Sequence, residues 1–246
     1  MAKPAGSACN LDCAYCFYLS KRVLPGGPGS GHMPDEVLER FVKDYIDSVT
    51  SDEVVFSWQG GEPTLLGLEF FEKVVTLQAK HAKPGQRIEN DLQTNGTLLD
   101  DDWARFLKQH RFLVGLSIDG PREIHDHCRI TKHAEPTFDQ VFAAAKMLQK
   151  HGVRFNTLTC VHRYNASRPL DVYRFLRREI GSTYIQFIPI VEIRGFENMA
   201  PGTWDEAKLP MLGDPRCHPD HPESVVTPWS VAAEEYGYFL SKIWDE

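Results

Sequence analysis

The chain has 246 residues, 42% of them hydrophobic and 25% charged, which is the composition of a folded globular protein and not of a disordered one. Its formal net charge of −7 argues against a nucleic-acid partner, because binding to phosphates depends on Lys and Arg. No apolar run of about 18 residues exists, and residues 1–12 lack the apolar stretch of a signal peptide, so we expect a cytoplasmic protein without a membrane partner.

Strand-like and helix-like segments alternate along the chain. Runs of β-branched and aromatic residues predict strands at Val54–Trp58, Ile88–Thr94, Leu113–Ile118, Arg154–Val161 and Tyr184–Val191, with a short one before them at Ala2–Ala5. Apolar residues spaced three and four apart predict helices at Pro34–Val49, Phe70–Ala82, Asp100–Gln109, Thr137–His151 and Pro169–Glu179. This alternation predicts an α/β fold with a parallel sheet. Six βα units are too few for a closed eight-fold barrel and suit an open, partial barrel or a doubly wound sheet.

Two stretches interrupt this alternation. Pro25–Gly31 is a glycine-rich surface loop, and residues 192–227 are rich in Pro, Gly and charge. A last helix is expected to begin at Thr227–Pro228, as an N-cap followed by Pro, and it is still amphipathic at Trp244. We therefore expect a fragment of a longer protein. Its predicted parts are a core domain over 1–191, an irregular linker or excursion over 192–227 and the start of a C-terminal helix over 228–246.

Three of the six cysteines, Cys9, Cys13 and Cys16, have the spacing C-x3-C-x2-C in the loop before the first helix. Thiolates are the ligands of iron–sulfur clusters, and three of them on a four-iron cluster leave one iron open for a small molecule. A structural zinc site is the main alternative, but zinc takes four ligands and the next candidate, His32, lies beyond a flexible loop. A chance group of core cysteines is a further alternative. The spacing favours a [4Fe–4S] cluster.

This cysteine motif, with Tyr15 before the last Cys, resembles the signature of the radical S-adenosylmethionine (SAM) superfamily. The resemblance implies a partial (β/α)6 TIM-like barrel, in agreement with the strand count above, and SAM as the second cofactor. In that superfamily the amino and carboxylate groups of SAM bind the open iron. An electron from the cluster then cleaves SAM to a 5′-deoxyadenosyl radical that abstracts a hydrogen atom.

Polar and glycine-rich turns end the next three predicted strands, within Trp58–Pro63, Gln93–Gly96 and Ser117–Pro121. A Gly pair lets the backbone approach a ligand closely, and a Ser hydroxyl with an Arg guanidinium can hold a ribose and a carboxylate. Plain turns with a solvated Arg are the alternative. The carboxyl ends of parallel strands share one edge of a barrel, where sites form. The resemblance implies SAM contacts at Gly60, Gly61, Glu62, Thr94, Asn95, Ser117 and Arg129.

Longer strings resemble the anaerobic sulfatase-maturating enzymes; they are Trp58–Phe71, Gln93–Leu99, Gly115–Pro121, His125–Arg129 and Gln186–Glu192. That resemblance implies oxidation of a Cys or Ser of a sulfatase to Cα-formylglycine, with a flavodoxin or ferredoxin-type electron donor. Tyr18, Gln59 and Gln93 match positions near the target peptide and are expected to orient it. Family members continue into a Cys-rich domain with two auxiliary clusters, and this chain stops before such a region.

Other interpretations stay open. The chain is alternatively another peptide-modifying radical SAM enzyme that forms thioether or carbon–carbon crosslinks, a non-catalytic zinc protein, or an inert fragment. Asp119, His125, Asp126 and His127 form either a polar group at the rim of the site or, as we expect, a solvated loop. An inert buried thiol is expected at Cys160, whereas Cys128 is either reactive or without a role. Cys217–His221 has metal-like chemistry, but it contains one Cys and falls in the irregular segment, which argues against a metal site.

Overall fold

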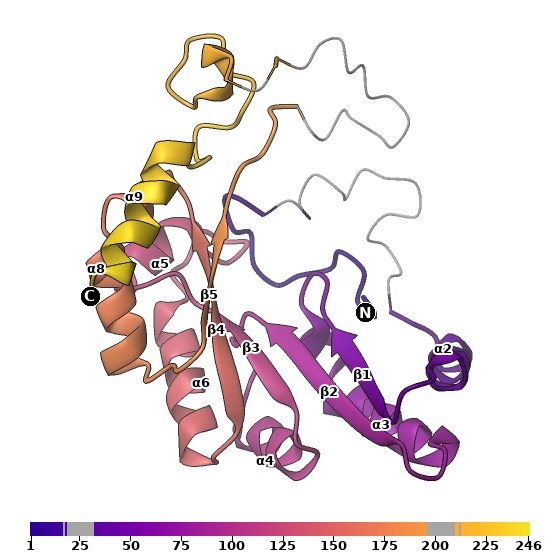
Figure 1. Ribbon diagram of the computed structural model, residues 1–246. Helices are drawn as coiled ribbons and strands as arrows, with labels where there is room; N and C mark the ends of the chain where they lie inside the picture. The colour runs from indigo at the N-terminus through magenta and orange to yellow at the C-terminus, as the bar shows by residue number, and fades with distance from the viewer. Residues whose placement is uncertain (17, 19–31, 196–209, 212) are drawn as a thin grey trace. The chain divides into compact units, whose positions relative to one another are not determined.

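The computed structural model describes residues 1–16, 18, 32–195, 210–211 and 213–246, and is shown in Figure 1. The predicted loop Pro25–Gly31 lies outside these residues. The chain divides into two compact units. The first comprises Met1–Asn10, Gly26–Ser117 and Gln140–Asn156, and the second comprises Leu11–Pro25, Ile118–Asp139 and Thr157–Glu246.

Three parallel strands form the sheet of the first unit, in the order β1 (Glu53–Trp58), β2 (Arg87–Thr94) and β3 (Leu113–Ser117), as Figure 1 shows. The predicted strand at Ala2–Ala5 is reduced to one parallel bridge between Ala2 and Trp58. Parallel pairing places the carboxyl ends of the strands at one edge, so the motifs predicted to bind SAM from this unit end neighbouring strands.

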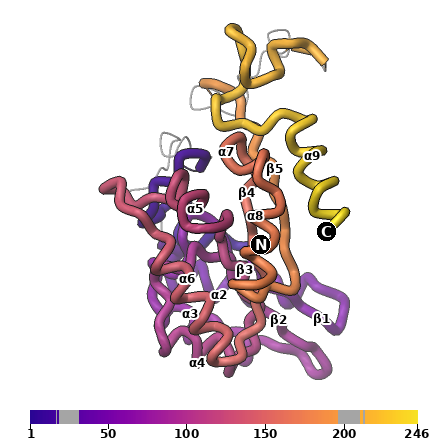
Figure 2. The backbone as a smooth tube through the Cα atoms, turned by 90° about the vertical axis from the view of Figure 1, so that its left-hand side faces the viewer, coloured from indigo at the N-terminus to yellow at the C-terminus, as the bar shows by residue number. Residues whose placement is uncertain are grey.

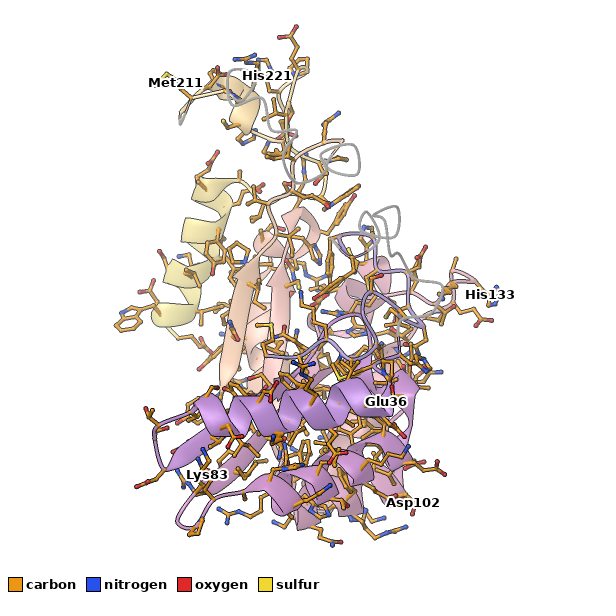
Figure 3. The ribbon with its side chains drawn as sticks, turned by 90° about the vertical axis from the view of Figure 1, so that its right-hand side faces the viewer. Glu36, Lys83, Asp102, His133, Met211 and His221 are labelled. Atoms are coloured by element: carbon orange, nitrogen blue, oxygen red, sulfur yellow. The ribbon has the colours of Figure 1, made fainter. Side chains whose placement is uncertain are left out.

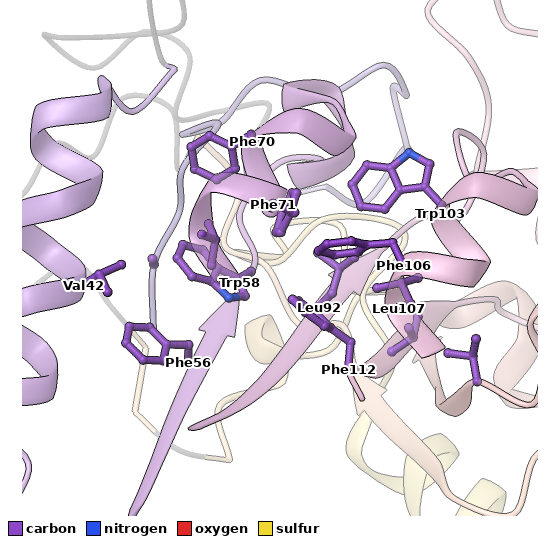
Figure 4. Packing of buried hydrophobic residues seen from close by; sticks show 14 of the residues in the cluster. Val42, Phe56, Trp58, Phe70, Phe71, Leu92, Trp103, Phe106, Leu107 and Phe112 are labelled. Carbon is purple, nitrogen blue, oxygen red and sulfur yellow. The ribbon is translucent and has the colours of Figure 1, made fainter. Parts of the chain in front are cut away.

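An aromatic cluster holds this sheet against its helices (Figure 4). Val54, Phe56 and Trp58 alternate along β1 and are fully buried, because successive side chains of a strand point to opposite faces. Burying each such side chain contributes about 1.5–3 kcal/mol. The helices that belong to this unit wholly or in large part are α2 (Asp35–Ser48), α3 (Leu68–His81), α4 (Asp101–Gln109) and α6 (Phe138–Lys150). Their apolar residues fall on one side of each helix, as the sequence predicted.

The second unit contains the parallel pair β4 (Arg154–Val161), through its last five residues, and β5 (Ile185–Pro189). Its helices are α5 (Arg122–Cys128), α7 (Arg163–Ala166), α8 (Pro169–Arg174) and α9 (Ala233–Trp244), with a π-helical turn at Phe175–Glu179 after α8. Figure 2 shows α9 running beside α7 and α8, which it contacts. Ile118, which continues β3, donates its backbone N–H to Leu158 of β4 at 3.1 Å.

The sequence misplaced the start of the last helix. Thr227 does not cap it, because Ser230 N donates to Thr227 O at 3.1 Å and closes a separate turn. The helix begins at Ala233, where the Glu235 carboxylate accepts from Ala232 N at 3.0 Å. The domain boundaries predicted around 191 and 227 stay a prediction. Among the residues that the structure describes, no helix combines the length and the apolarity that a membrane crossing needs.

Candidate functional site

In the first unit, the strand-end glycines lie against the backbone that leads into Cys9. Gly61 N donates to Gly6 O at 2.9 Å, and Glu62 N donates to Ala8 O at 2.7 Å. A Cβ atom built on Gly61 would lie 2.0 Å from Ala8 O, so no other residue fits there without a shift of the backbone. The glycine pair therefore fixes the position from which the cysteine loop starts.

The Glu62 carboxylate joins the ends of β1 and β2. Its side chain is buried, and it accepts hydrogen bonds from Thr64 N at 3.0 Å, Thr94 Oγ1 at 2.8 Å and Asn95 N at 2.7 Å. Burial raises the pKa of Glu62, and the hydrogen bonds from Asn95, Thr64 and Thr94 offset part of that rise. Glu62 and Thr94 therefore shape this edge of the sheet through bonds to each other.

Asn95 connects this edge to the first cysteine. Its Nδ2 atom donates to Asn10 Oδ1 at 2.9 Å and lies 3.8 Å from Cys9 Sγ. Thr97 holds the amide from the other side, because Thr97 N donates to Asn95 Oδ1 at 3.0 Å. An amide N–H directed at a thiolate stabilises its negative charge, and hydrogen bonds to sulfur tune iron–sulfur clusters. This donor fits a metal-binding cysteine at position 9.

Cys13 and Cys16 belong to the second unit. Ala14 N donates to Cys128 O at 2.9 Å, and Cys16 N donates to Cys13 O at 2.9 Å, so the loop is folded onto the end of α5. All six cysteines are free of disulfides. Three cysteines outside any disulfide lie on one short loop and fit the donor set of a [4Fe–4S] cluster. The loop begins where Gly61 approaches Ala8 too closely for any other residue.

Asp119 is the centre of a buried polar network in this unit. Its carboxylate accepts from the Tyr15 hydroxyl, from Arg129 Nε at 2.9 Å and from Cys160 N at 2.9 Å. Burial raises the pKa of Asp119, but the positive charge of Arg129, together with His162, His125 and the hydrogen bond from Tyr15, lowers it by more in total, so the net pKa lies below its usual value. The expectation of a solvated Asp119 is therefore wrong: it is an ionised, fully buried side chain.

The expected solvated loop around His125 and Asp126 is also wrong, since these residues form α5. His125 is fully buried, with Nδ1 accepting from Asp119 N at 3.4 Å and Nε2 lying 3.1 Å from Thr137 Oγ1. Burial lowers the pKa of His125 to about 3, so its ring is neutral. Asp126 accepts from Thr137 N at 2.9 Å and Phe138 N at 2.8 Å. The spacing of Ile124 and Cys128, both buried, is the signal that would have predicted this helix.

His162 is a buried polar residue that the sequence did not single out. It follows β4 directly and stacks on the Tyr15 ring, with 5.3 Å between the ring centroids. Neither of its ring nitrogens has a hydrogen-bond partner among the described residues. Burial lowers the pKa of His162 to about 4, so the ring is neutral at pH 7. The sequence signal that could have predicted a buried His162 is its position directly after β4, a strand with alternating buried residues.

The thiols of Cys128 and Cys160 are not activated. Burial, followed by the charge of Asp119, raises the pKa of both Cys128 and Cys160 to about 12, in line with the inert thiol expected at Cys160.

The Cys217–His221 segment, of which Figure 3 labels His221, forms no metal site among the described residues. In the part of the chain that the structure describes, no three His, Cys, Asp or Glu side chains converge on one ion. His218 Nε2 instead lies 3.1 Å from Glu234 Oε1. A four-iron cluster is a different case, because each of its thiolates binds a different iron and the three need not converge on one ion.

Gln59 and Gln93 lie at the carboxyl ends of two neighbouring strands. Ser57 pairs with Asp91 in the strand register, and Ser57 Oγ donates to Asp91 Oδ2 at 2.8 Å. Gln93 belongs to β2 and follows Asp91 by two residues, so it lies on the same face of the strand, whereas Gln59 directly follows the last residue of β1. Both are half-buried, as is Tyr18, whose neighbours lie outside the described residues.

Ser117 and Arg129 do not belong to the same unit. Ser117 is the buried last residue of β3, and Arg129 follows α5 in the second unit. The Arg129 guanidinium is only 9% exposed and is paired with Asp119, so it is not the solvated Arg that the plain-turn alternative requires.

Three comparisons agree on the relatives of this chain. The family model of the Radical SAM superfamily matches residues 4–176. A serine-type anaerobic sulfatase-maturating enzyme of Bacteroides thetaiotaomicron is 42% identical over 246 residues, covering 100% of this chain and 56% of that protein. A cysteine-type anaerobic sulfatase-maturating enzyme of Clostridium perfringens is 45% identical over 214 residues, covering 85% of this chain and 57% of that protein.

Solved structures extend the match to the fold. A structure of native anSMEcpe with bound AdoMet and a peptide superposes with a TM-score of 0.78 at 37% identity, covering 99% of this chain and 57% of that one. The α/β fold of the partial (β/α)6 TIM-like barrel type is thereby confirmed, as are SAM and the [4Fe–4S] cluster as the cofactors of the family. The chain spans little more than half the length of these relatives. It belongs to the radical SAM superfamily and, within it, to the family of anaerobic sulfatase-maturating enzymes.

Proposed function

We propose that this chain carries the cluster and SAM sites of a maturase that oxidises a Cys or Ser of a sulfatase to Cα-formylglycine. The observation that carries the proposal is the match, over 99% of the chain, to a relative described with bound AdoMet and peptide. Both serine-type and cysteine-type enzymes occur among the relatives, so the proposal covers either target residue.

Cys9, Cys13 and Cys16 would hold the cluster. Three observations support this assignment: the cysteines form no disulfides, the backbone of Gly61 approaches Ala8 closely before the first cysteine, and the Asn95 amide lies beside Cys9. A zinc site would require a fourth ligand. When bound, the cluster supplies the electron that cleaves SAM and so generates the radical that removes a Cβ hydrogen from the target residue.

Four residues would hold SAM. Gly60 and Gly61 offer their backbone to its amino group, Ser117 its hydroxyl, and Arg129 its positive charge to the carboxylate. Glu62 and Thr94 would act on this site by keeping the two strand ends together, and Asn95 by its donor near Cys9.

Gln59 and Gln93 would orient the peptide, with Tyr18 as a third contact. Their positions at the ends of the neighbouring strands β1 and β2 support this role, because two amide side chains can fix both a backbone and a side-chain group of the target. An electron donor of the flavodoxin or ferredoxin type and a cytoplasmic setting complete the proposal, the latter in keeping with six free cysteines.

The test is anaerobic reconstitution of the chain with iron and sulfide, followed by assay of 5′-deoxyadenosine from SAM and of sulfatase peptides by mass. We expect 5′-deoxyadenosine, abolished when Cys9, Cys13 and Cys16 are all replaced by Ala. A formylglycine product from the Cys or the Ser peptide would support the maturase. Binding of one zinc without iron would overturn the proposal, and a crosslinked peptide would favour the other peptide-modifying class.

A further inference from the structure

Asp119 gathers groups from three separate stretches of the second unit onto one buried carboxylate. Tyr15 comes from the cysteine loop, Arg129 follows α5, and Cys160 belongs to β4. The Arg129 guanidinium makes two bonds to it, with Nε at 2.9 Å from Oδ2 and Nη2 at 3.3 Å from Oδ1. The Asp119 side chain is fully buried, and no step of the chemistry above uses it.

The two side chains on this carboxylate belong to different parts of the cofactor site. Tyr15 lies between the ligands Cys13 and Cys16, whereas Arg129 is assigned to the SAM carboxylate. They also contact each other, because the guanidinium carbon of Arg129 lies 5.6 Å from the centre of the Tyr15 ring. Because the guanidinium is planar, bonds along its Nε–Nη2 edge also fix the direction in which its other N–H groups point. Of these, Nη1 makes no hydrogen bond within the described residues.

The carboxylate is itself held in place. Asp119 N donates to His125 Nδ1 at 3.4 Å, and Asp119 O accepts from Asn165 Nδ2 at 3.5 Å. The preceding residue, Ile118, is bonded to Leu158 of β4. A residue that positions others must have its own geometry fixed by surrounding contacts, and Asp119 meets that condition.

We propose that Asp119 is a positioning residue that couples SAM recognition to the cysteine loop. One carboxylate orients the Arg129 guanidinium toward the SAM carboxylate and binds the hydroxyl of Tyr15, which stands between the ligands Cys13 and Cys16 in the sequence. The inference rests on the proposed function, since it takes Arg129 as the residue that binds SAM. It assigns to Asp119 a role in SAM affinity without any contact between Asp119 and SAM.

The test compares Asp119→Asn with wild type in the full chain, reconstituted anaerobically with iron and sulfide. SAM affinity is measured from the change that SAM causes in the electron paramagnetic resonance spectrum of the reduced cluster, and iron content is measured beside it. Removal of such a supporting partner typically weakens binding about 10- to 100-fold. We expect a loss of that size in SAM affinity with the cluster still present.

The chain offers a matched control in Asp139→Asn. Asp139 also makes two hydrogen bonds to an arginine, Arg122, but the two side chains are 79% and 55% exposed. We expect wild-type SAM affinity in this variant, because exposed ion pairs contribute little. If Asp119→Asn does not fold, Asp119→Glu retains the charge while displacing the carboxylate, and it is expected to weaken SAM binding with normal iron content.

Each outcome is decisive. Wild-type SAM affinity in folded, cluster-bearing Asp119→Asn or Asp119→Glu would overturn the inference while leaving the proposed function intact. A wild-type chain that takes up no four-iron cluster or binds no SAM would overturn the proposed function, and this inference with it. Equal losses in Asp119→Asn and Asp139→Asn would also overturn it, since the effect would then follow charge and not position.

Discussion

Glu62 in the first unit and Asp119 in the second are both buried carboxylates at strand ends, but their negative charges are treated differently. Glu62 receives hydrogen bonds from Thr64, Thr94 and Asn95, and no cation pairs with it among the described residues. Asp119 receives hydrogen bonds and also a buried guanidinium from Arg129. The pKa of Glu62 is raised and that of Asp119 is lowered.

The difference shows what each kind of partner contributes. Burial raises the pKa of both carboxyls, since removal from water disfavours the charged form. Hydrogen bonds from neutral donors reduce that effect at Glu62, whereas at Asp119 the charge of Arg129 and the smaller contributions of its other neighbours together outweigh it. The first unit therefore builds its edge by shape and neutral hydrogen bonds, and the second unit depends on a permanent charge pair.

The largest expected effect comes from breaking the charge pair. Asp119→Asn leaves Arg129 buried without its counter-ion, which typically destabilises a protein by about 3–5 kcal/mol. Urea unfolding of the cluster-free chain at pH 7 measures this loss. Asp139→Asn, at the exposed pair with Arg122, is expected to cost about 0–1 kcal/mol. A similar small cost in both variants would show that the Asp119 pair is not the centre of the second unit.

A steric change, and not a change of charge, is expected to destabilise the first unit most. Gly61→Ala places a methyl group where Ala8 O lies 2.0 Å away, so the strand-end loop and the cysteine loop must separate. Overpacking of this kind costs about 1–3 kcal/mol. Thermal unfolding and iron retention after reconstitution should both fall. Gly67→Ala is the control, because its added Cβ meets no atom within 4 Å although its positive φ carries some strain of its own. Equal losses in Gly61→Ala and Gly67→Ala would point to backbone strain and not to the close approach of Gly61 to Ala8.

Much of this architecture was predictable from local patterns. Five of the six expected strands and four of the expected helices lie within two residues of their expected ranges, because the periods of two and of three to four are strong in Val54–Trp58 and Pro34–Val49. The expected helix Pro169–Glu179 is divided into α8 and the π-helical turn that follows it. The cysteine loop and the strand-end motifs were predictable for a different reason, since their residue types are set by cofactor chemistry. These signals are contained within short segments.

What the sequence missed depends on contacts between distant residues. Asp119 looked like a turn residue, and its burial follows from Arg129 and Cys160, 10 and 41 positions away. The helix α5 is short and polar, so its sequence pattern resembled that of a loop. Its burial depends on a contact between His125 and Thr137 that the local pattern does not show. The start of α9 was misplaced because a good capping pair at Thr227–Pro228 closes a turn instead. Tertiary partners decided all three.

The pH dependence of stability sharpens the comparison. A raised pKa means that folded wild type holds the Glu62 proton more tightly than the unfolded chain, so this contribution is complete below pH 4.5 and is lost as pH rises through the folded pKa. Glu62→Gln cannot titrate and loses one acceptor, at a cost of about 1–3 kcal/mol. Its destabilisation relative to wild type should therefore shrink as pH rises above 4.5.

Asp119→Asn should behave in the opposite way. The lowered pKa of Asp119 means that its contribution is complete above pH 3.8 and is lost only as pH falls through the folded pKa. Its destabilisation should be constant between pH 5 and 7, where that of Glu62→Gln changes. Urea unfolding of both variants across this range tests the pair. Parallel curves would show that the two carboxyls do not differ in the way their partners indicate.

The smallest expected effect concerns His162, a side chain whose ring nitrogens make no hydrogen bond within the described residues. Phe in its place keeps a ring against Tyr15 and removes two buried nitrogens that lack partners. Because an unsatisfied buried polar group costs about 1–3 kcal/mol, His162→Phe should leave the free energy of unfolding unchanged or raise it. His125→Phe is the matched comparison: both ring nitrogens of His125 have partners, so stability should fall. A loss in His162→Phe as large as that in His125→Phe would mean that the Tyr15 stack requires an imidazole, and that the second unit depends on more than its one charge pair.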